Sequence, residues 1–273
     1  MLVPIDGLHL AIEDHGPVDA PAIVLLHGYI ASSRCWRNLI PALTHAGFRA
    51  ITIDALGNGD SDRCPTADPT LAASARRVLA VMDHLNLSVA TLLATSYGGA
   101  VALQCACLAP QRVRRLILAA PAHPYVAGPR RTAAAYNTVI GKALAHTYPF
   151  VPRSIFRRGM ATMFADPARC THEIAAIYRA PMRRAGTIRC LLGPLQTFGS
   201  DMDALARGLR RIAHIPARMI WGDRDNVVPL STADLLMCRF SDAKLEVLPS
   251  VGHIAYEEAP QEFQAAVLRA LAA

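Results

Sequence analysis

The chain has 273 residues, of which 52% are hydrophobic and 18% are charged, and its formal net charge is +7. This length is sufficient for one large α/β domain with an inserted segment, and it far exceeds the size at which core burial is marginal. No apolar run approaches the roughly 18 to 20 residues that a membrane span needs, and the acidic residues near the N-terminus argue against a signal peptide. We therefore expect a cytoplasmic protein.

Seven cysteines are scattered along the chain: Cys35, Cys64, Cys105, Cys107, Cys170, Cys190 and Cys238. Their number is odd, and their spacing does not match that of zinc ligands. We expect reduced thiols that are mostly buried, and neither a metal nor another cofactor.

Apolar residues alternate between strand-like and helix-like patterns through the first 122 residues and again after residue 214. Short apolar runs predict strands over 5–14, 22–26, 49–54, 90–95, 115–120, 217–221 and 244–248. Longer patterns predict helices over 36–46, 70–86, 101–109 and from about 259 to the end. This alternation favours the α/β class, with a mostly parallel sheet and helices on both faces.

Ser96 lies where the predicted strand over 90–95 passes directly into a helical pattern. A residue in such a sharp turn usually has positive φ, which exposes its side chain and requires very small residues two positions before and after it. Ala94 and Gly98 meet this requirement. The turn also directs the Tyr97 N–H and the positive end of the following helix toward a ligand at the Ser96 hydroxyl.

This segment resembles the nucleophile elbow of the α/β-hydrolase fold, small-x-Ser-x-Gly. The sequence departs from the common form at Ala94, which replaces a glycine, and at Thr95, which replaces a frequent histidine. Because alanine adds only one methyl group, we expect the turn to form. The alternative interpretation is a serine that caps a helix beside a glycine pair, and the rest of the chain decides between the two.

The loop His27-Gly28-Tyr29 follows a predicted buried strand. In the α/β-hydrolase fold such a loop lies beside the elbow. The resemblance therefore implies that the Tyr29 N–H and the Tyr97 N–H are the two donors of an oxyanion hole. His27 is expected to be structural, because the loop backbone supplies the donor.

The segment that begins at Asp54, DALGNGDSD, resembles the Asp-x-x-Gly-x-Gly-x-Ser loop that is common in this family. The glycines allow tight turns. We expect Asp54 and Ser61 to hydrogen-bond backbone groups, and we do not interpret Asp54 as catalytic.

The strand pattern stops between residues 123 and 214. Helix-like pieces such as 132–146 and 167–178 are expected there between prolines, among them Pro181 and Pro194, and the stretch carries 14 basic but only four acidic residues. The rest of the chain carries 14 basic and 17 acidic residues, so the charge boundary coincides with the structural one. We predict a helical cap over 123–214, inserted into a hydrolase core of 1–122 and 215–273. A cap is typical of the family, because ligands bind at the carboxyl ends of parallel strands.

The last core segment contains two further candidates for a catalytic triad. WGDRDNVVP resembles the family's Trp-Gly-x-x-Asp-x-x-x-Pro loop, which implies Asp225 as the acid, whereas Asp223 falls two positions early and is expected to be a turn residue. SVGHIAYEEAP resembles the Gly-His-x-x-x-x-Glu-x-Pro segment, which implies His253 as the base. Ser96, Asp225 and His253 each follow a predicted strand directly, so we expect them at one edge of the sheet.

This set of residues predicts a serine hydrolase that transfers an acyl group to water. His253 would accept the Ser96 proton, and Asp225 would hold the imidazole tautomer and stabilise its positive form. Serine at this position argues against haloalkane dehalogenases and epoxide hydrolases of this fold, which use aspartate there.

A carboxylesterase or lactonase is the leading interpretation. A carbon–carbon bond hydrolase of ring-cleavage products and a perhydrolase would use the same triad, although carbon–carbon hydrolases tend to have asparagine where this chain has Thr95. A ligand-binding protein of this fold without catalysis is the alternative from a different class.

The arginine-rich cap suggests a small-molecule substrate with an anionic group. Arg183 or Arg184 would pair bidentately with a carboxylate, and His123 would line the pocket because it follows a predicted core strand. The alternative is that these arginines only solvate the surface, because the chain has just two lysines. We expect neither a nucleic acid nor a membrane partner, since no aromatic-interleaved basic motif or amphipathic anchor is present. Monomer and homodimer both remain open.

Overall fold

The central element of the fold is an eight-stranded sheet. The structure is a computed structural model that describes residues 1–272. Its strands are β1 Leu2–Ile5, β2 Leu8–His15, β3 Ala22–Leu26, β4 Arg49–Ile53, β5 Ala90–Thr95, β6 Val113–Ala119, β7 Ala217–Gly222 and β8 Ala243–Leu248. They lie in the order β1-β2-β4-β3-β5-β6-β7-β8, and all neighbours from β4 to β8 are parallel. The predicted α/β class and mostly parallel sheet are confirmed.

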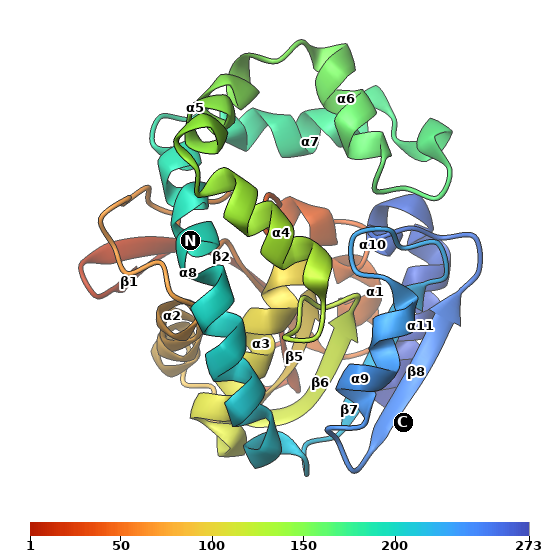
Figure 1. Cartoon of the computed structure of the whole chain (residues 1–273). Coiled ribbons are helices and arrows are strands. Elements are labelled where there is room, and N and C mark those ends of the chain that lie inside the picture. Colours follow the sequence, from red (N-terminus) through yellow and green to blue (C-terminus); the bar gives the residue numbers. More distant parts are fainter. Residues whose placement is uncertain (273) are drawn as a thin grey trace.

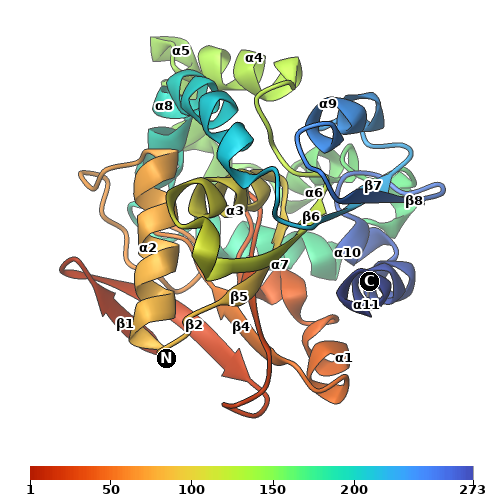
Figure 2. The ribbon, with the colours of Figure 1, turned by 90° about the horizontal axis from the view of Figure 1, so that it is seen from below.

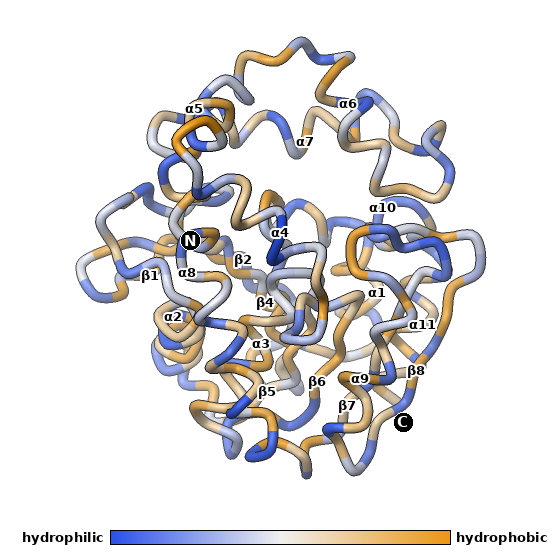
Figure 3. Tube along the Cα trace, in the orientation of Figure 1, coloured by the Kyte–Doolittle hydropathy of each residue, from blue (hydrophilic) through white to orange (hydrophobic). Residues whose placement is uncertain are grey.

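The inner strands are buried on both faces. Every residue of β4, β5 and β7 is buried, which explains why these segments are continuous apolar runs instead of alternating ones. Alternate residues of β3 enter different cores, because Val24 and Leu26 belong to one hydrophobic cluster and Ile23 and Leu25 to the other. Figure 3 shows the hydrophobic strands inside a periphery with many hydrophilic segments.

Helices cover both faces of the sheet, as predicted. The core helices are α1 Ile40–His45, α2 Leu71–His84, α3 Ser96–Leu108, α9 Ala233–Met237, α10 Ala255–Glu258 and α11 Pro260–Ala272. Figure 2 shows α2 and α3 on one face of the sheet and α1 and α11 on the other. Thr70 caps α2 as its side chain accepts a hydrogen bond from the Ala73 N–H at 3.2 Å.

The N-terminal edge differs from the prediction. The single edge strand expected over 5–14 is a hairpin of β1 and β2, which pair in antiparallel orientation. The turn is Asp6-Gly7, in which both residues have positive φ, 52° and 78°. Two positive φ values in a two-residue loop match the twist of a hairpin, so the Asp-Gly pair was the signal that the prediction missed.

The helix expected over 36–46 is interrupted. A 3₁₀ turn occupies Ser33–Trp36, and α1 begins only at Ile40. Pro41 explains the interruption, because proline has no N–H to continue a helix from the preceding turn and is tolerated only in the first turn of a new one.

Five helices lie between β6 and β7: α4 Ala127–Tyr136, α5 Val139–Thr147, α6 Arg153–Ala161, α7 His172–Met182 and α8 Thr187–Gly208. We call them the inserted helices. In Figure 1 most of them lie above the ends toward which the parallel strands point. α4 packs against α8, and α6 against α7. No helix in residues 1–272 is both long and apolar enough to cross a membrane.

The inserted helices are divided differently from the prediction. The piece expected over 132–146 spans parts of α4 and α5, which are separated where the Thr138 hydroxyl accepts the Gly141 N–H at 3.0 Å. Pro181 and Pro194 were expected between helices, but they lie inside α7 and α8. Tertiary packing therefore outweighs the hydrogen bond that each proline removes.

Candidate active site

Ser96 occupies a sharp turn between β5 and α3, with φ of 51°. Small neighbours make this turn possible. A Cβ atom on Gly98 would lie 2.4 Å from the carbonyl oxygens of both Leu26 and His27, and one on Gly28 would lie 3.3 Å from the Ser96 Cβ atom. The elbow and the end of β3 therefore lie so close together that no residue larger than glycine fits at position 98.

The structure brings Ser96, Asp225 and His253 together, although they are far apart in sequence. His253 Nε2 lies 3.0 Å from Ser96 Oγ, and His253 Nδ1 lies 2.8 Å from Asp225 Oδ2. Asp225 and His253 are only 7% and 5% exposed. Because a carboxylate only accepts hydrogen bonds, Nδ1 carries the proton and Nε2 is free to accept the hydroxyl proton of Ser96.

The second oxygen of Asp225 fixes its orientation. Oδ1 accepts the N–H groups of Val227 and Val228 at 2.8 and 2.9 Å. Asp223 instead accepts the Val251 N–H at 3.3 Å. Asp223 is thus a turn residue, as predicted.

The Tyr97 N–H belongs to the first turn of α3, where backbone amides have no partner within the helix. The Tyr29 N–H donates no hydrogen bond within residues 1–272. The aromatic rings of Tyr29 and Tyr97 pack edge to face with centroids 6.1 Å apart. The residues that carry the two predicted donors are therefore neighbours in space.

His27 supports the loop that carries Tyr29. Its Nδ1 atom donates to the Gly28 carbonyl oxygen at 2.7 Å, and its Nε2 atom accepts the Ala55 N–H at 3.0 Å. Desolvation lowers the pKa of His27, which favours the neutral ring that this pair of hydrogen bonds requires. The structural role that we predicted for His27 is confirmed.

The loop after β4 supports the same region. Asp54 accepts the N–H groups of Ser33 and Asp60 at 2.6 and 2.8 Å, and Ser61 Oγ donates to the Asp54 carbonyl oxygen, which confirms their architectural role. The sequence analysis missed Asn58, whose amide donates to the carbonyl oxygens of Tyr29 and Ala31, both at 2.9 Å. The only feature of the sequence that could have indicated this role of Asn58 is its position between Gly57 and Gly59.

The sequence of residues 23–266 matches the Alpha/beta hydrolase family. The chain belongs to this family. It is 31% identical over 241 residues to the dihydrolipoyllysine-residue acetyltransferase component of an acetoin cleaving system from Pseudomonas putida, a match that covers 88% of this chain and 60% of that protein. The chain therefore spans less than two thirds of that relative's length.

Two solved structures show the same architecture. A hydrolase from Pseudomonas aeruginosa PA01 is 30% identical, with a TM-score of 0.80 and coverage of 100% of this chain and 98% of that chain. A meta-cleavage product hydrolase from Pseudomonas fluorescens IP01 is 22% identical, with a TM-score of 0.83 and coverage of 100% and 97%. At this identity the second likeness concerns the fold alone.

In this alpha/beta hydrolase, Glu258 connects the His253 loop to the inserted helices. Its Oε2 atom accepts the N–H groups of Gly252 and Ala165 at 2.7 and 3.0 Å, and its Oε1 atom accepts the Asp166 N–H at 2.8 Å. The His253 N–H also donates to the Met163 carbonyl oxygen at 2.8 Å. Glu258 is the glutamate of the Gly-His-x-x-x-x-Glu-x-Pro segment, but its partners in the insertion were not predictable from that pattern.

The acid loop is held by the same part of the insertion. Asn226, which follows Asp225, donates to the Thr162 carbonyl oxygen at 2.6 Å. Segment 162–166 therefore contacts both the acid loop and the base loop, and we call it the clamp segment.

An apolar cavity of about 180 Å³ lies between the Tyr29 loop and the inserted helices. It is lined by Tyr29, Ile30, Tyr136, Ala145, Tyr148, Met182, Ile188, Leu191, Leu192 and Leu195. The Tyr29 hydroxyl donates to the Leu191 carbonyl oxygen, which ties the candidate oxyanion loop to α8.

The two arginines predicted to contact substrate line other cavities: Arg183 lines cavities of about 640 and 500 Å³ on the inserted helices, and Arg184 lines the second of these. Arg183 and Arg184 are exposed at the end of α7, and Arg184 pairs with Asp60 at 2.6 Å. Neither arginine lines the cavity beside Tyr29. The charge of the insertion suggested an anionic ligand without indicating which cavity would bind it.

His123 is buried behind the acid loop and does not line that cavity either. It is 1% exposed, its Nε2 atom lies 3.1 Å from Thr232 Oγ1, and its ring packs against Trp221 and Tyr125. Burial lowers the pKa of His123 from 6.5 to about 4. The ring is therefore neutral at physiological pH and acts as packing.

We expect His123 to make the protein less stable in acid. Between pH 6.5 and pH 4 the unfolded chain binds a proton on this residue that the folded protein does not, so the unfolding free energy falls as the pH falls. Over the whole window the expected loss is about 3 kcal/mol. Denaturant unfolding at pH 7.5 and 5 should show a smaller pH effect in His123→Asn than in wild type, and an unchanged effect in the exposed control His45→Asn. Equal pH effects in His123→Asn and wild type would contradict this account.

Proposed function

We propose that this chain is a carboxylic ester hydrolase, a carboxylesterase or lactonase, that works through Ser96, His253 and Asp225. The observation that carries the proposal is the continuous hydrogen-bonded series from Ser96 Oγ through both ring nitrogens of His253 to Asp225 Oδ2. A serine hydroxyl is a poor nucleophile at neutral pH, and this arrangement supplies the base that activates it.

In the first step the Ser96 Oγ atom attacks the ester carbonyl carbon while its proton moves to His253 Nε2. The carbonyl π electrons move onto oxygen, and the N–H groups of Tyr29 and Tyr97 stabilise that oxyanion; loss of one such donor typically costs about 2.7 to 4 kcal/mol. The carbon–oxygen bond to the leaving group then breaks, and the alcohol departs with the proton from His253.

In the second step His253 removes a proton from water, whose oxygen attacks the acyl group on Ser96. The bond to Ser96 Oγ breaks, and the proton returns from His253 to the serine. Asp225 stays ionised throughout and stabilises the imidazolium in both steps. The net reaction adds one water molecule across the ester bond.

The apolar cavity beside Tyr29 supports a substrate with a hydrophobic group. Ten side chains line it, and none is an acid or a base. We propose that residues 123–214 form a cap over the site, because helices α5, α7 and α8 supply most of this wall. Apolar walls with few polar groups are typical of small-molecule sites.

A fluorophosphonate probe tests the nucleophile. The Ser96 Oγ atom should attack the probe's phosphorus and displace fluoride, so mass spectrometry of the digested protein should place one phosphonyl group on the peptide that contains Ser96. Heat-denatured protein is the control and should not react. Native protein without this adduct would favour the ligand-binding alternative.

A panel of substrates tests the bond that is cleaved. We expect turnover of p-nitrophenyl hexanoate and of medium-ring lactones. Faster turnover of a vinylogous diketone of the ring-cleavage type than of any ester would favour a carbon–carbon bond hydrolase instead.

A further inference from the structure

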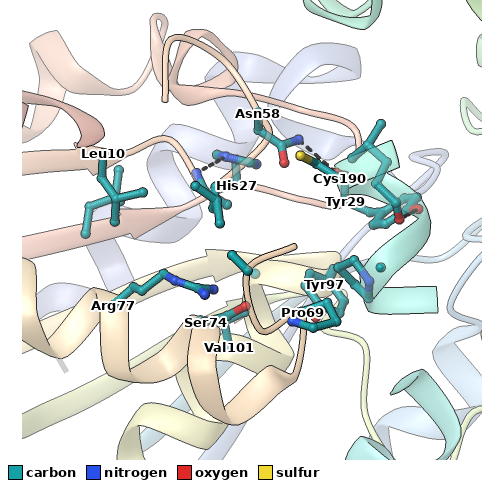
Figure 4. Close-up of a pocket in the computed structure, with 18 of the residues that line it drawn as sticks. Leu10, His27, Tyr29, Asn58, Pro69, Ser74, Arg77, Tyr97, Val101 and Cys190 are labelled. Carbon is teal, nitrogen blue, oxygen red and sulfur yellow. Dashed lines mark hydrogen bonds between the residues drawn. The ribbon is translucent and has the colours of Figure 1, made fainter. Parts of the chain in front are cut away.

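A second cavity, of about 80 Å³, is lined at one end by Tyr29 and Tyr97 and at the other by helix α2 (Figure 4). One buried water needs roughly 10 to 15 Å³ of such space, so the cavity of about 80 Å³ has room for several water molecules or for one short chain. Its aliphatic walls are Leu10, Leu26, Ile53, Leu56, Val78 and Val101. We call it the Arg77 cavity after the one basic side chain on its wall other than His27.

The Arg77 guanidinium is half-buried, and Figure 4 shows it directed into the cavity toward Ser74. Its Nη2 atom donates to the Asp68 carbonyl oxygen at 2.9 Å. Within residues 1–272 this is its only hydrogen bond, and no carboxylate lies within 4.0 Å of it. Most of its five N–H groups are therefore free to bind a ligand.

Asp68, which also lines the cavity, and Asp201 are occupied by other groups. Asp68 Oδ1 accepts the Thr70 N–H at 2.9 Å, and Asp68 Oδ2 pairs with Arg76 at 3.4 Å. Asp201 accepts the Leu71 N–H at 3.0 Å. Desolvation lowers the pKa of Arg77, with Asp68 as the largest opposing influence, so its charge is incompletely compensated in the free protein.

Two hydroxyl groups lie on the same cavity wall. The Tyr97 hydroxyl oxygen is buried and has no hydrogen bond of normal geometry within residues 1–272, and the Ser74 hydroxyl lies close enough for a weak interaction with it. A buried hydroxyl without a partner is unfavourable by roughly 1 to 3 kcal/mol. A carboxylate in the cavity would accept hydrogen bonds from hydroxyl and guanidinium groups together.

We propose that the Arg77 cavity binds the free carboxylate of an anionic acyl group, so that the preferred substrates are esters of dicarboxylic acids with one acid group unesterified. This inference rests on the proposed ester hydrolysis at Ser96. Tyr29 and Tyr97, whose N–H groups form the proposed oxyanion hole, line one end of the cavity, and Arg77 lies at the other end. The aliphatic walls between them would contact the methylene chain of the acyl group. The anionic specificity that the insertion suggested is thus assigned to an arginine of the core.

Matched ester pairs test the proposal. We expect wild-type kcat/KM to be higher for mono-p-nitrophenyl adipate or suberate than for p-nitrophenyl hexanoate or octanoate, which have the same chain lengths. Arg77→Gln should lower kcat/KM for the anionic esters about tenfold or more and change it less than about twofold for the neutral ones. Arg76→Gln, on the exposed side of the same helix, and Arg184→Gln should leave the ratio unchanged.

Binding to Ser96→Ala separates the subsite from the chemistry. Calorimetry should show tighter binding of monomethyl adipate than of methyl hexanoate, and Arg77→Gln in the same background should remove the difference. This result without turnover of any ester would support the subsite and overturn the proposed hydrolysis. Normal turnover of neutral esters, with no anionic preference or with one that survives Arg77→Gln, would overturn the subsite and leave the hydrolysis intact.

Discussion

Replacement of Asp225 with asparagine is expected to lower kcat for ester hydrolysis by about 10⁴-fold, the effect of the corresponding change in a Ser-His-Asp triad. Asp225 Oδ2 accepts the proton on His253 Nδ1 at 2.8 Å. An asparagine amide in that place would donate to Nδ1, so the proton would move to Nε2. His253 would then be unable to accept the Ser96 proton.

The expected loss of activity in Asp225→Asn also depends on whether the side chain at position 225 keeps its orientation. Asp225 Oδ1 is held by two backbone N–H groups, from Val227 and Val228, so the asparagine oxygen keeps those contacts and the NH₂ group takes the position facing His253. The fold should be preserved, and circular dichroism and thermal unfolding should be close to those of wild type.

Asp223→Asn is the matched control for this experiment, since Asp223 lies two residues away, accepts the Val251 N–H at 3.3 Å and lies 3.9 Å from the Arg224 guanidinium, without contact to His253. Pre-steady-state measurement of p-nitrophenol release should show that Asp225→Asn slows acylation itself. If Asp223→Asn lowered kcat as much as Asp225→Asn, the assignment of the acid would be wrong.

The sequence predicted the core because local signals there agree with one another. The sharp turn at Ser96 needs small residues on either side of it. Gly98 also lies so close to the end of β3 that a side chain there would collide with the backbone, so local turn geometry and tertiary packing both require glycine at this position. The loop that carries Asp225 follows β7, every residue of which is buried, and the loop that carries His253 follows the edge strand β8, in which apolar and charged residues alternate. Both strands could therefore be recognised from their residue patterns, and the positions of the two loops followed from them.

The contacts between the core and the insertion were not predictable in the same way. Arg77 faces a cavity and Arg76 faces solvent, yet they are adjacent arginines on one helix. The difference arises from side-chain direction and from loop 54–69, which covers α2 without a periodic pattern. Arg183 and Arg184 lie in the insertion but line neither the cavity beside Tyr29 nor the Arg77 cavity, and a charge count contains no information about which cavity a side chain faces.

Replacement of Glu258 with glutamine is expected to lower the unfolding free energy by about 2 to 4 kcal/mol and to reduce turnover at the same time. The carboxylate of Glu258 accepts three backbone N–H groups, and its side chain belongs to a residue that is only 5% exposed. A glutamine has a single carbonyl oxygen, so its NH₂ group would face at least one N–H donor. That donor would remain buried without an acceptor.

Turnover should fall because the lost hydrogen bonds join the clamp segment to the base loop. Gly252 precedes His253, and the His253 N–H itself donates to Met163 within the clamp segment. A shift of this loop would lengthen the 3.0 Å contact between His253 Nε2 and Ser96 Oγ, on which proton transfer depends. Glu262→Gln on the exposed face of α11 is the control and should change neither quantity.

Urea unfolding and kcat for p-nitrophenyl hexanoate measure the two effects on the same Glu258→Gln preparation. A variant with lower stability but wild-type kcat at 10 °C, where it is fully folded, would mean that the base loop keeps its position without the clamp segment. Loss of kcat in the fully folded variant would instead establish that the insertion positions His253 from outside the core, and that the contacts of Glu258 are part of what makes the hydroxyl of Ser96 reactive.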